Sequence, residues 1–148
     1  MEPPAGFVPC NDNAFEGLAG PFYVKRHFDS QGRPIFSLSA RIRDDLTGAS
    51  DRAHGGFILT LLDQAMGLGA RDALGDLAFT ISLHTDFIGP AHVGRWVTAH
   101  AHATSTTSTF AFMTASAESD GHPVATGSGV WRLRRTGGQL PEGRRPSY

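Results

Sequence analysis

The chain has 148 residues, of which 40 % are hydrophobic and 18 % are charged. This length and this balance predict one globular domain with a single core. A net charge of −1 excludes the strongly basic surface that is typical of nucleic-acid-binding proteins. The single cysteine, Cys10, cannot form a disulfide within the chain, which favours a reducing, cytoplasmic location.

The start of the chain predicts a loose lead-in followed by a hairpin. Residues 1–20 are rich in proline and glycine, which favours an irregular segment with one short helical turn at Asn13–Leu18. Two strands are predicted at 21–28 and 34–43, because polar and apolar residues alternate there on either side of a polar turn. A polar loop, 44–53, then leads into the most distinctive stretch of the sequence.

A long apolar stretch from His54 to Ala70 predicts the central helix, which should end near Leu74 because Gly75 is a typical helix stop. The stretch is apolar on nearly all sides, so we expect the rest of the protein to wrap around it. An acid within it, Asp63, and a length of about 17 residues favour a buried core helix over a membrane span.

Two features of this helix are unusual for a plain core element. It begins with His54-Gly55-Gly56, and the first amide groups of a helix have no internal partner and carry partial positive charge. They can hold a carbonyl oxygen as it becomes an oxyanion. Asp63 is costly to bury without a partner or a chemical task. A simpler interpretation is a glycine-rich helix start with a half-buried acid paired to a threonine or a backbone N–H.

Spacing along the helix constrains how these groups can act together. Gly55 and Asp63 are eight residues apart, which is about 12 Å along a helix at about 1.5 Å per residue. One scissile carbonyl therefore cannot contact both residues of one chain. If both act on one substrate, they come from two helices that run side by side in opposite directions, in a two-fold dimer with two sites.

Four further strands are predicted after the helix, at 79–88, 95–105, 109–118 and 124–134. In the first of them, alternation places two sets of side chains on opposite faces: Phe79, Ile81, Leu83 and Phe87 against Thr80, Ser82, His84 and Asp86. Connections as short as the turn at 90–94 favour antiparallel pairing. Small residues in the later strands suit close packing of a curved sheet against the helix, among them Ala99, Ala101, Ala115, Gly127 and Gly129.

Together these elements predict an α+β fold in which one antiparallel sheet curls around one long helix. The domain is expected to span 21–135, between the lead-in at 1–20 and a flexible tail at 136–148. A single sheet of this kind leaves an edge and a face to protect, which favours dimerisation.

At these residues the sequence resembles a known family. His54-Gly-Gly, six residues, and then Asp63 within Leu-Asp-Gln-Ala-Met-Gly resemble the acyl-CoA thioesterases of the hotdog fold, above all the PaaI-type and Arthrobacter-type 4-hydroxybenzoyl-CoA thioesterases. The segment 86–94, Asp-Phe-Ile-Gly-Pro-Ala-His-Val-Gly, is similar to a strand and turn of that family. The resemblance covers 36–134 and implies the hotdog fold.

The resemblance also implies a role for each candidate site residue. Gly55 N–H would polarise the thioester carbonyl at a turn shaped by His54, and Asp63 of the partner subunit would act as general base or as nucleophile. Thr80 would hydrogen-bond the nucleophilic water, with an ordinary strand threonine as the alternative. Substrate contacts are expected from Gly56, Phe57, Gln64 and Met66, with Leu61 as a further wall residue.

The expected function is hydrolysis of an aromatic or medium-chain acyl-CoA by a homodimer or a dimer of dimers. No cofactor, metal, nucleic acid or membrane is expected to take part. Two alternatives stay open: a non-catalytic acyl-CoA-binding hotdog protein, and a hotdog hydratase or dehydratase. In the latter, His54 and Asp63 of the partner subunit would share one site.

Other polar residues form incomplete patterns. His100 and His102 lie on one strand face but lack a convincing third metal ligand. Four arginines are candidates for contact with CoA phosphates: Arg95, Arg132, Arg134 and Arg135. Members of the family often carry Asn or Gln a few residues before His-Gly-Gly, whereas 47–52 has no amide side chain here, which leaves Ser50 or Asp51 as a candidate substitute.

Overall fold

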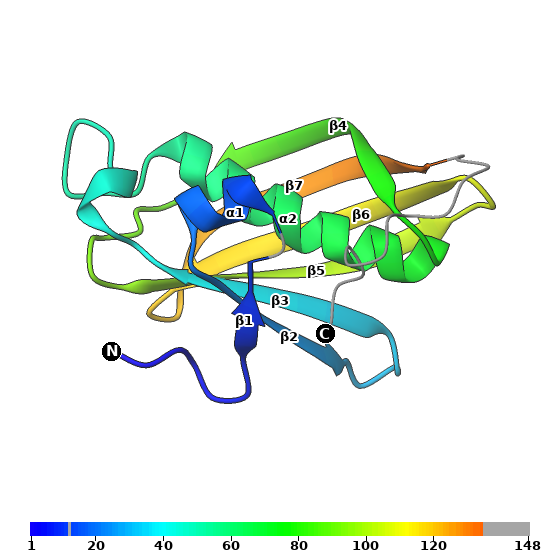
Figure 1. Cartoon of the computed structure of the whole chain (residues 1–148), viewed down its shortest axis with the longest axis horizontal. Helices are drawn as coiled ribbons and strands as arrows, with labels where there is room; N and C mark the ends of the chain where they lie inside the picture. Colours follow the sequence, from blue (N-terminus) through cyan, green and yellow to red (C-terminus); the bar gives the residue numbers. More distant parts are fainter. Residues whose placement is uncertain (12, 135–148) are drawn as a thin grey trace.

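The computed structural model describes residues 1–11 and 13–134, which form one seven-stranded sheet curled around a long helix (Figure 1). The strands are β1 (Val8–Cys10), β2 (Phe22–Phe28), β3 (Pro34–Arg41), β4 (Ala78–Phe87), β5 (Trp96–Thr106), β6 (Phe110–Ser119) and β7 (His122–Leu133). The helices are α1 (Ala14–Ala19) and α2 (Gly55–Leu74), with a 3-10 turn at Asp44–Leu46. All strand pairs are antiparallel, in the order β1-β2-β3-β5-β6-β7-β4.

The position of β4 differs from the expectation that short turns join paired strands. β4 does not pair with β5, the next strand in the chain; it pairs with β7 at the edge of the sheet. The connection crosses the end of the sheet, where Ile88 N–H donates to Val124 O beyond β4 and Gly94 N–H donates to Ile42 O beyond β3. Its eight residues, 88–95, can span about 26 Å, whereas three strand spacings need only about 14 Å.

Local contacts set both ends of α2 where the sequence predicts them. His54 is the N-cap, and its ring accepts the Gly56 N–H. Gly75 is the C-cap; it adopts the left-handed conformation, with φ of 76°, and donates its N–H to Arg71 O. Because these contacts join residues close in sequence, the limits of this helix could be predicted without knowledge of the fold.

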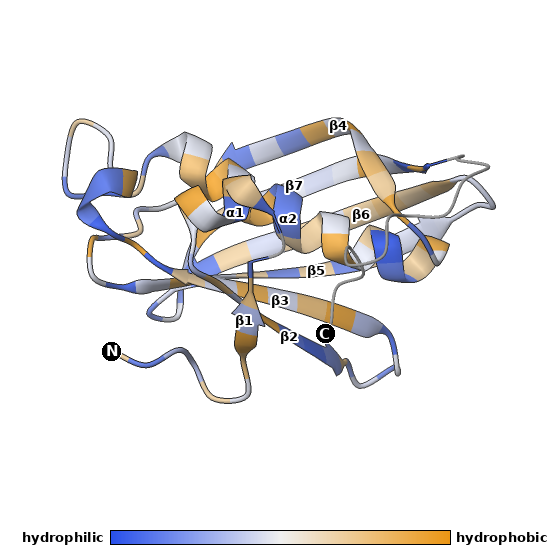
Figure 2. Ribbon diagram, in the orientation of Figure 1, coloured by the Kyte–Doolittle hydropathy of each residue, from blue (hydrophilic) through white to orange (hydrophobic). Residues whose placement is uncertain are grey.

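The core lies between α2 and the concave face of the sheet. Small buried residues on β5 and β6 let the helix approach closely, and a Cβ at Gly69 of α2 would lie only 2.6 Å from Met113 Cε. Figure 2 shows hydrophobic residues along α2 and also on the edge strand β4. The sheet covers only one side of the helix, however, because Leu59 is exposed and Asp63 is half-buried. The expectation that the helix is wrapped on all sides is therefore not met within a single chain.

The lead-in is more regular than its composition indicates. β1 pairs with β2, with Val8 opposite Val24. The helical turn predicted at Asn13–Leu18 is confirmed as α1, whose first turn is capped by Asn13 Oδ1 accepting from Glu16 N–H at 3.0 Å. No helix in the described part of the chain is long and apolar enough to cross a membrane. The tail predicted at 136–148 lies outside the described residues.

Candidate active site

The first turn of α2 offers one free backbone donor. His54 Nδ1 accepts the Gly56 N–H at 2.9 Å, so this nitrogen carries no proton and the neutral ring is protonated at Nε2. Phe57 and Ile58 donate to His54 O, whereas Gly55 N–H has no acceptor among residues 1–11 and 13–134. This free N–H lies at the positive end of the helix dipole and can bind an oxygen that carries negative charge.

The two glycines at the helix start differ in the space around them. A Cβ at Gly55 would lie 3.4 Å from the Phe87 ring, and a Cβ at Gly56 would lie 3.0 Å from His54 Nδ1. Close packing therefore explains the second glycine of the His-Gly-Gly pattern, whereas at the first glycine the aromatic ring from β4 lies at ordinary contact distance. The same packing brings the end of β4 beside the free Gly55 N–H.

Asp63 lies two turns further along α2 and has a neutral partner. Thr80 Oγ1 on β4 donates to Asp63 Oδ1 at 2.8 Å. Burial raises the pKa of Asp63, and the hydrogen bond from Thr80 opposes that rise. No ion pair to Asp63 is present within the described residues. The carboxyl group is therefore more basic than an exposed aspartate and is held in one orientation.

A β-bulge in β4 brings Thr80 to the helix. Simple alternation predicts that Thr80 lies on the face opposite Leu83, but the register shifts between Thr80 and Ser82, which leaves Ile81 as an extra residue. Thr80 is consequently opposite the buried Trp131 and faces α2. The prediction of its face was wrong, because a bulge cannot be recognised from alternation alone.

One side of α2 connects the two ends of the site. Gly55, Leu59 and Asp63 follow one another at intervals of four residues, which places them along one side of the helix. Leu59 is 37 % exposed there. Figure 1 shows β4 as the sheet edge beside this helix. This edge strand, which pairs only with β7 within the described residues, and the residue that follows it expose four large apolar side chains by 54–58 %: Phe79, Ile81, Phe87 and Ile88.

The sequence did not indicate Leu59 and the exposed residues of β4 as part of the site, because each of them resembles an ordinary core residue. The available signal was the four-residue spacing between Leu59 and Asp63, which places a leucine on the same side of the helix as the acid. Nothing in the sequence indicates that β4 is an edge strand, since strand order depends on pairing between distant segments.

The structure places the predicted substrate contacts in different environments. Gln64 is half-buried on α2, next to Asp63 in the chain. Phe57 is buried and stacks on Phe22, with ring centroids 6.2 Å apart. Leu61 and Met66 are completely buried between the helix and the sheet. The last two therefore fill the core of a single chain, and contact between them and a substrate stays a prediction.

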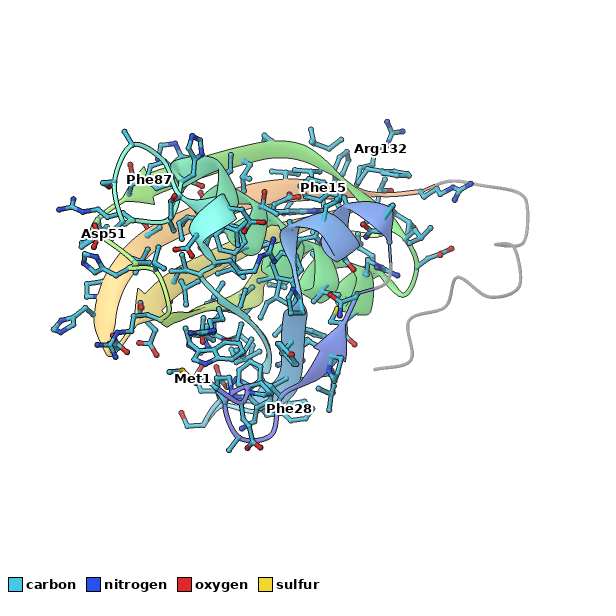
Figure 3. The ribbon with its side chains drawn as sticks, turned by 60° about the vertical axis from the view of Figure 1, so that its left-hand side comes forward. Met1, Phe15, Phe28, Asp51, Phe87 and Arg132 are labelled. Atoms are coloured by element: carbon cyan, nitrogen blue, oxygen red, sulfur yellow. The ribbon has the colours of Figure 1, made fainter. Side chains whose placement is uncertain are left out.

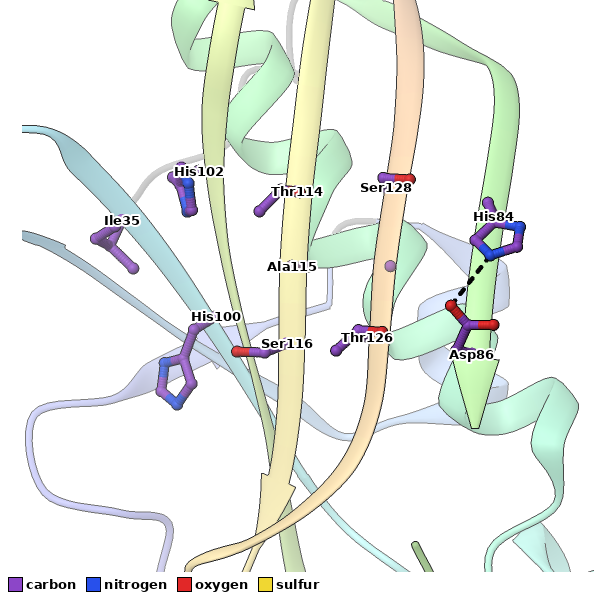
Figure 4. Close-up of a pocket in the computed structure, with 11 residues that line it drawn as sticks. Ile35, His84, Asp86, His100, His102, Thr114, Ala115, Ser116, Thr126 and Ser128 are labelled. Carbon is purple, nitrogen blue, oxygen red and sulfur yellow. Dashed lines mark hydrogen bonds and ion pairs between the residues drawn. The ribbon is translucent and has the colours of Figure 1, made fainter. Parts of the chain in front are cut away.

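A second cluster of titratable residues lies on the outer face of the sheet. A groove of about 440 Å³ lies there. Figure 4 shows that it is lined by His100 and His102 on β5 and by His84 and Asp86 on β4, with hydroxyl side chains between them. His84 Nε2 lies 3.1 Å from Asp86 Oδ2, and both side chains are exposed. In the part of the chain that the structure describes, no three His, Cys, Asp or Glu residues are arranged to hold a metal ion.

The remaining candidates lie at the periphery. Arg95 Nε is 3.4 Å from Asp120 Oδ2, at the end of the sheet, and Arg135 is outside the described residues. Asp51, one candidate substitute for the missing amide, contacts His92 Nδ1 at 3.1 Å on the loop that precedes α2. Both side chains of this pair are exposed. The loop therefore holds Asp51 at the surface, and it has no amide side chain in front of the helix.

Comparison with known proteins shows that the chain is similar to thioesterases and to a putative esterase. Residues 51–126, which include Asp63 and Thr80, match the family model of the Thioesterase superfamily. The chain is also similar to the Pseudomonas aeruginosa protein named "Putative esterase PA0474", with 31 % identity over 137 residues that cover 90 % of this chain and 98 % of the relative.

Solved structures share the fold. The TT0310 protein from Thermus thermophilus has a TM-score of 0.70 at 24 % identity and covers 81 % of this chain and 97 % of its own. The E. coli PaaI protein from the phenylacetic acid degradation operon has a TM-score of 0.70 at 15 % identity, over 82 % of this chain and 89 % of its own. These similarities confirm the predicted hotdog fold.

Proposed function

Because the chain belongs to the thioesterase superfamily, we propose that it hydrolyses acyl-CoA thioesters to a free acid and CoA. The observation that carries this proposal is the environment of Asp63. Its half-buried carboxyl group has a raised pKa, is oriented by Thr80, and lies on the same side of α2 as the free Gly55 N–H. Thioester hydrolysis needs this pair of functions, a base or nucleophile and a donor to the developing oxyanion.

The proposed site lies between two protomers. Among the residues that the structure describes, β4 has a neighbouring strand on one side only. Antiparallel pairing of two β4 strands would set two α2 helices side by side in opposite directions. Gly55 of one protomer would then approach Asp63 of the partner subunit, which the separation of about 12 Å within one chain requires. The exposed apolar residues of β4, together with Leu59, support this arrangement because such a dimer would cover them.

In the proposed reaction, the thioester carbonyl oxygen accepts a hydrogen bond from Gly55 N–H as it becomes negative. Asp63 Oδ1 is engaged by Thr80, which leaves Oδ2 available to act on the substrate. Oδ2 either takes a proton from an attacking water or attacks the carbonyl carbon and forms a mixed anhydride that water then hydrolyses. In the first route, Asp63 passes the proton of the water to the CoA thiolate as the C–S bond breaks. In the second route, the C–S bond breaks when the anhydride forms, and the thiolate takes up the proton that water loses when it hydrolyses the anhydride.

The geometry of His54 disfavours the hydratase alternative. That chemistry needs a histidine nitrogen that is free to take up a proton. His54 Nδ1 already accepts the Gly56 N–H, and Nε2 carries the ring proton. Neither nitrogen is therefore a free base.

The proposal is tested by release of free thiol from benzoyl, phenylacetyl, short, medium and long acyl-CoAs, with Asp63→Asn beside the wild-type protein. We expect the variant to lose at least about a hundredfold in kcat/KM, as for loss of an acid–base group. Asp72→Asn is the matched control, because Asp72 is on the same helix but forms an exposed ion pair with Arg26. This control should retain activity within about twofold.

The outcomes separate the alternatives. Equal activity of Asp63→Asn and wild type would remove Asp63 from the chemistry. If the wild-type protein hydrolyses none of the thioesters but binds acyl-CoA thioethers, the non-catalytic binding protein replaces the proposed enzyme. Hydration of an enoyl-CoA, measured in parallel, would favour the hydratase instead.

A further inference from the structure

The short helix α1 has an inverted arrangement of side chains. Its acid, Glu16, is buried, whereas Phe15 and Leu18 are 54 % and 77 % exposed. These two apolar residues are three positions apart and so share one side of the helix. Single exposed apolar residues are common on protein surfaces, but a helix that buries its acid and exposes two large apolar side chains indicates a surface with an apolar partner.

Two contact paths hold α1 near the start of α2. Arg43 Nη2 donates to Leu18 O at 3.1 Å, and Leu46, three residues after Arg43, accepts the His54 N–H at 2.8 Å. On the other side, Phe22 begins β2 three residues after the last residue of α1 and stacks on Phe57 of α2. Figure 1 shows α1 in front of the first half of α2, the half that begins at Gly55.

The proposed site needs apolar surface for the acyl group, and the predicted wall residues of α2 do not provide it within a single chain. Leu61 and Met66 are completely buried in the core, and Phe57 is covered by Phe22. The exposed apolar residues of β4 would be covered by a partner subunit that pairs along that strand. Leu59 of α2 is 37 % exposed on the same side as Asp63, and the proposed dimer would cover it as well. Phe15 and Leu18 of α1 are then the exposed apolar side chains left near the start of α2 within the described residues.

We propose that Phe15 and Leu18 form a wall of the acyl pocket and contact the part of the acyl group that is remote from the thioester. This inference rests on the proposed thioesterase function and names the residues that set its preference for acyl size. A bulky acyl group buries apolar area against the two side chains, whereas an acetyl group ends at the thioester carbonyl and does not reach them.

The test compares a double variant, Phe15→Ser with Leu18→Ser, with the wild-type protein. We expect kcat/KM for decanoyl-CoA and phenylacetyl-CoA to fall at least about tenfold, the loss expected for two apolar contacts, and kcat/KM for acetyl-CoA to stay within about twofold. Phe28→Ser is the matched control: Phe28 is similarly exposed, and Figure 3 shows it at the opposite end of the molecule from Phe15. It should not change the acyl preference.

A binding measurement separates this inference from the proposed reaction. Calorimetry with S-decyl-CoA and S-ethyl-CoA, two thioethers that cannot be hydrolysed, should show a selective loss of S-decyl-CoA affinity in the double variant. That result would support the wall even if the wild-type protein hydrolysed no thioester. An unchanged ratio of the two affinities overturns the inference. So does a double variant that dissociates to monomers during size-exclusion chromatography, because α1 would then be a subunit contact.

Discussion

The two faces of the sheet hold their carboxyl groups in different ways. On the concave face, where α2 packs, Asp63 of that helix is half-buried, contacts the neutral hydroxyl of Thr80, and has a pKa raised by burial. On the outer face, Asp86 is exposed and lies 3.1 Å from His84 in the groove. A neighbouring histidine and acid would attract attention in the sequence. The acid whose pKa is raised by burial is Asp63, however, and its partner is a threonine hydroxyl. Partial burial beside a neutral donor, more than the presence of an Asp–His pair, is the reason for placing the proposed reaction at Asp63.

The largest difference between the faces should be in stability. Met66 is completely buried between α2 and the sheet, so Met66→Ala should lower the free energy of unfolding by about 2–5 kcal/mol. On the outer face, Ser128 is exposed, and Ser128→Ala should change it by less than about 0.5 kcal/mol. Urea denaturation measures both. Similar losses for the two variants would show that the outer face is also part of a packed core.

Removal of the threonine hydroxyl should reveal how the acid is oriented. Thr80→Val leaves Asp63 without its donor, so we expect activity at neutral pH to fall by about tenfold, the scale of a hydrogen bond to a charged group. Because that hydrogen bond lowers the pKa of Asp63, the rising limb of the pH–activity profile should also move to higher pH.

Two further variants sharpen this measurement. Thr80→Ser keeps the hydroxyl and should restore most of the activity and the original pH profile. Thr126→Val makes the same chemical change on the outer face, where Thr126 lines the groove, and should leave both unchanged. An unshifted pH profile in Thr80→Val would contradict the orienting role of Thr80.

Asp63 should lower stability at the pH at which it functions. Burial raises its pKa in the folded state above the unfolded value, so the folded protein binds this proton more tightly. The protonated carboxyl group of Asp63 therefore stabilises the folded state at low pH. This contribution is lost as the pH rises through the pKa that Asp63 has in the folded protein. Asp63→Asn should therefore raise Tm at pH 8 relative to wild type, and the gain should shrink toward pH 4. A gain that does not depend on pH would exclude this cause.

The smallest effect is expected from Asp86. Asp86 and its partner His84 both have exposed side chains, and pairs of this kind contribute about 0–1 kcal/mol to the free energy of unfolding. Asp86→Asn should keep thioester hydrolysis within about twofold of wild type. A hundredfold loss in this variant would move the chemistry to the outer groove and reverse the comparison of the two faces.

Much of the fold followed from local sequence patterns. Alternation located the strands, and the His54 and Gly75 caps bounded α2, because each signal joins residues within a few positions of one another. The position of β4 beside β7 was not predictable in this way. The loop at 88–95 is long enough to cross the sheet, so strand order was decided by pairing between segments about 45 residues apart.

For the candidate site, helical spacing was enough to predict that a glycine-rich helix start and an interior acid lie on one helix, too far apart to act within one chain. The surroundings of these two groups depend on packing between distant segments. The bulge at Ile81 turns Thr80 toward Asp63, and the edge position of β4 exposes apolar residues beside Leu59. Helical spacing is a local property of the backbone, whereas burial and contacts between helix and sheet depend on how the whole chain packs.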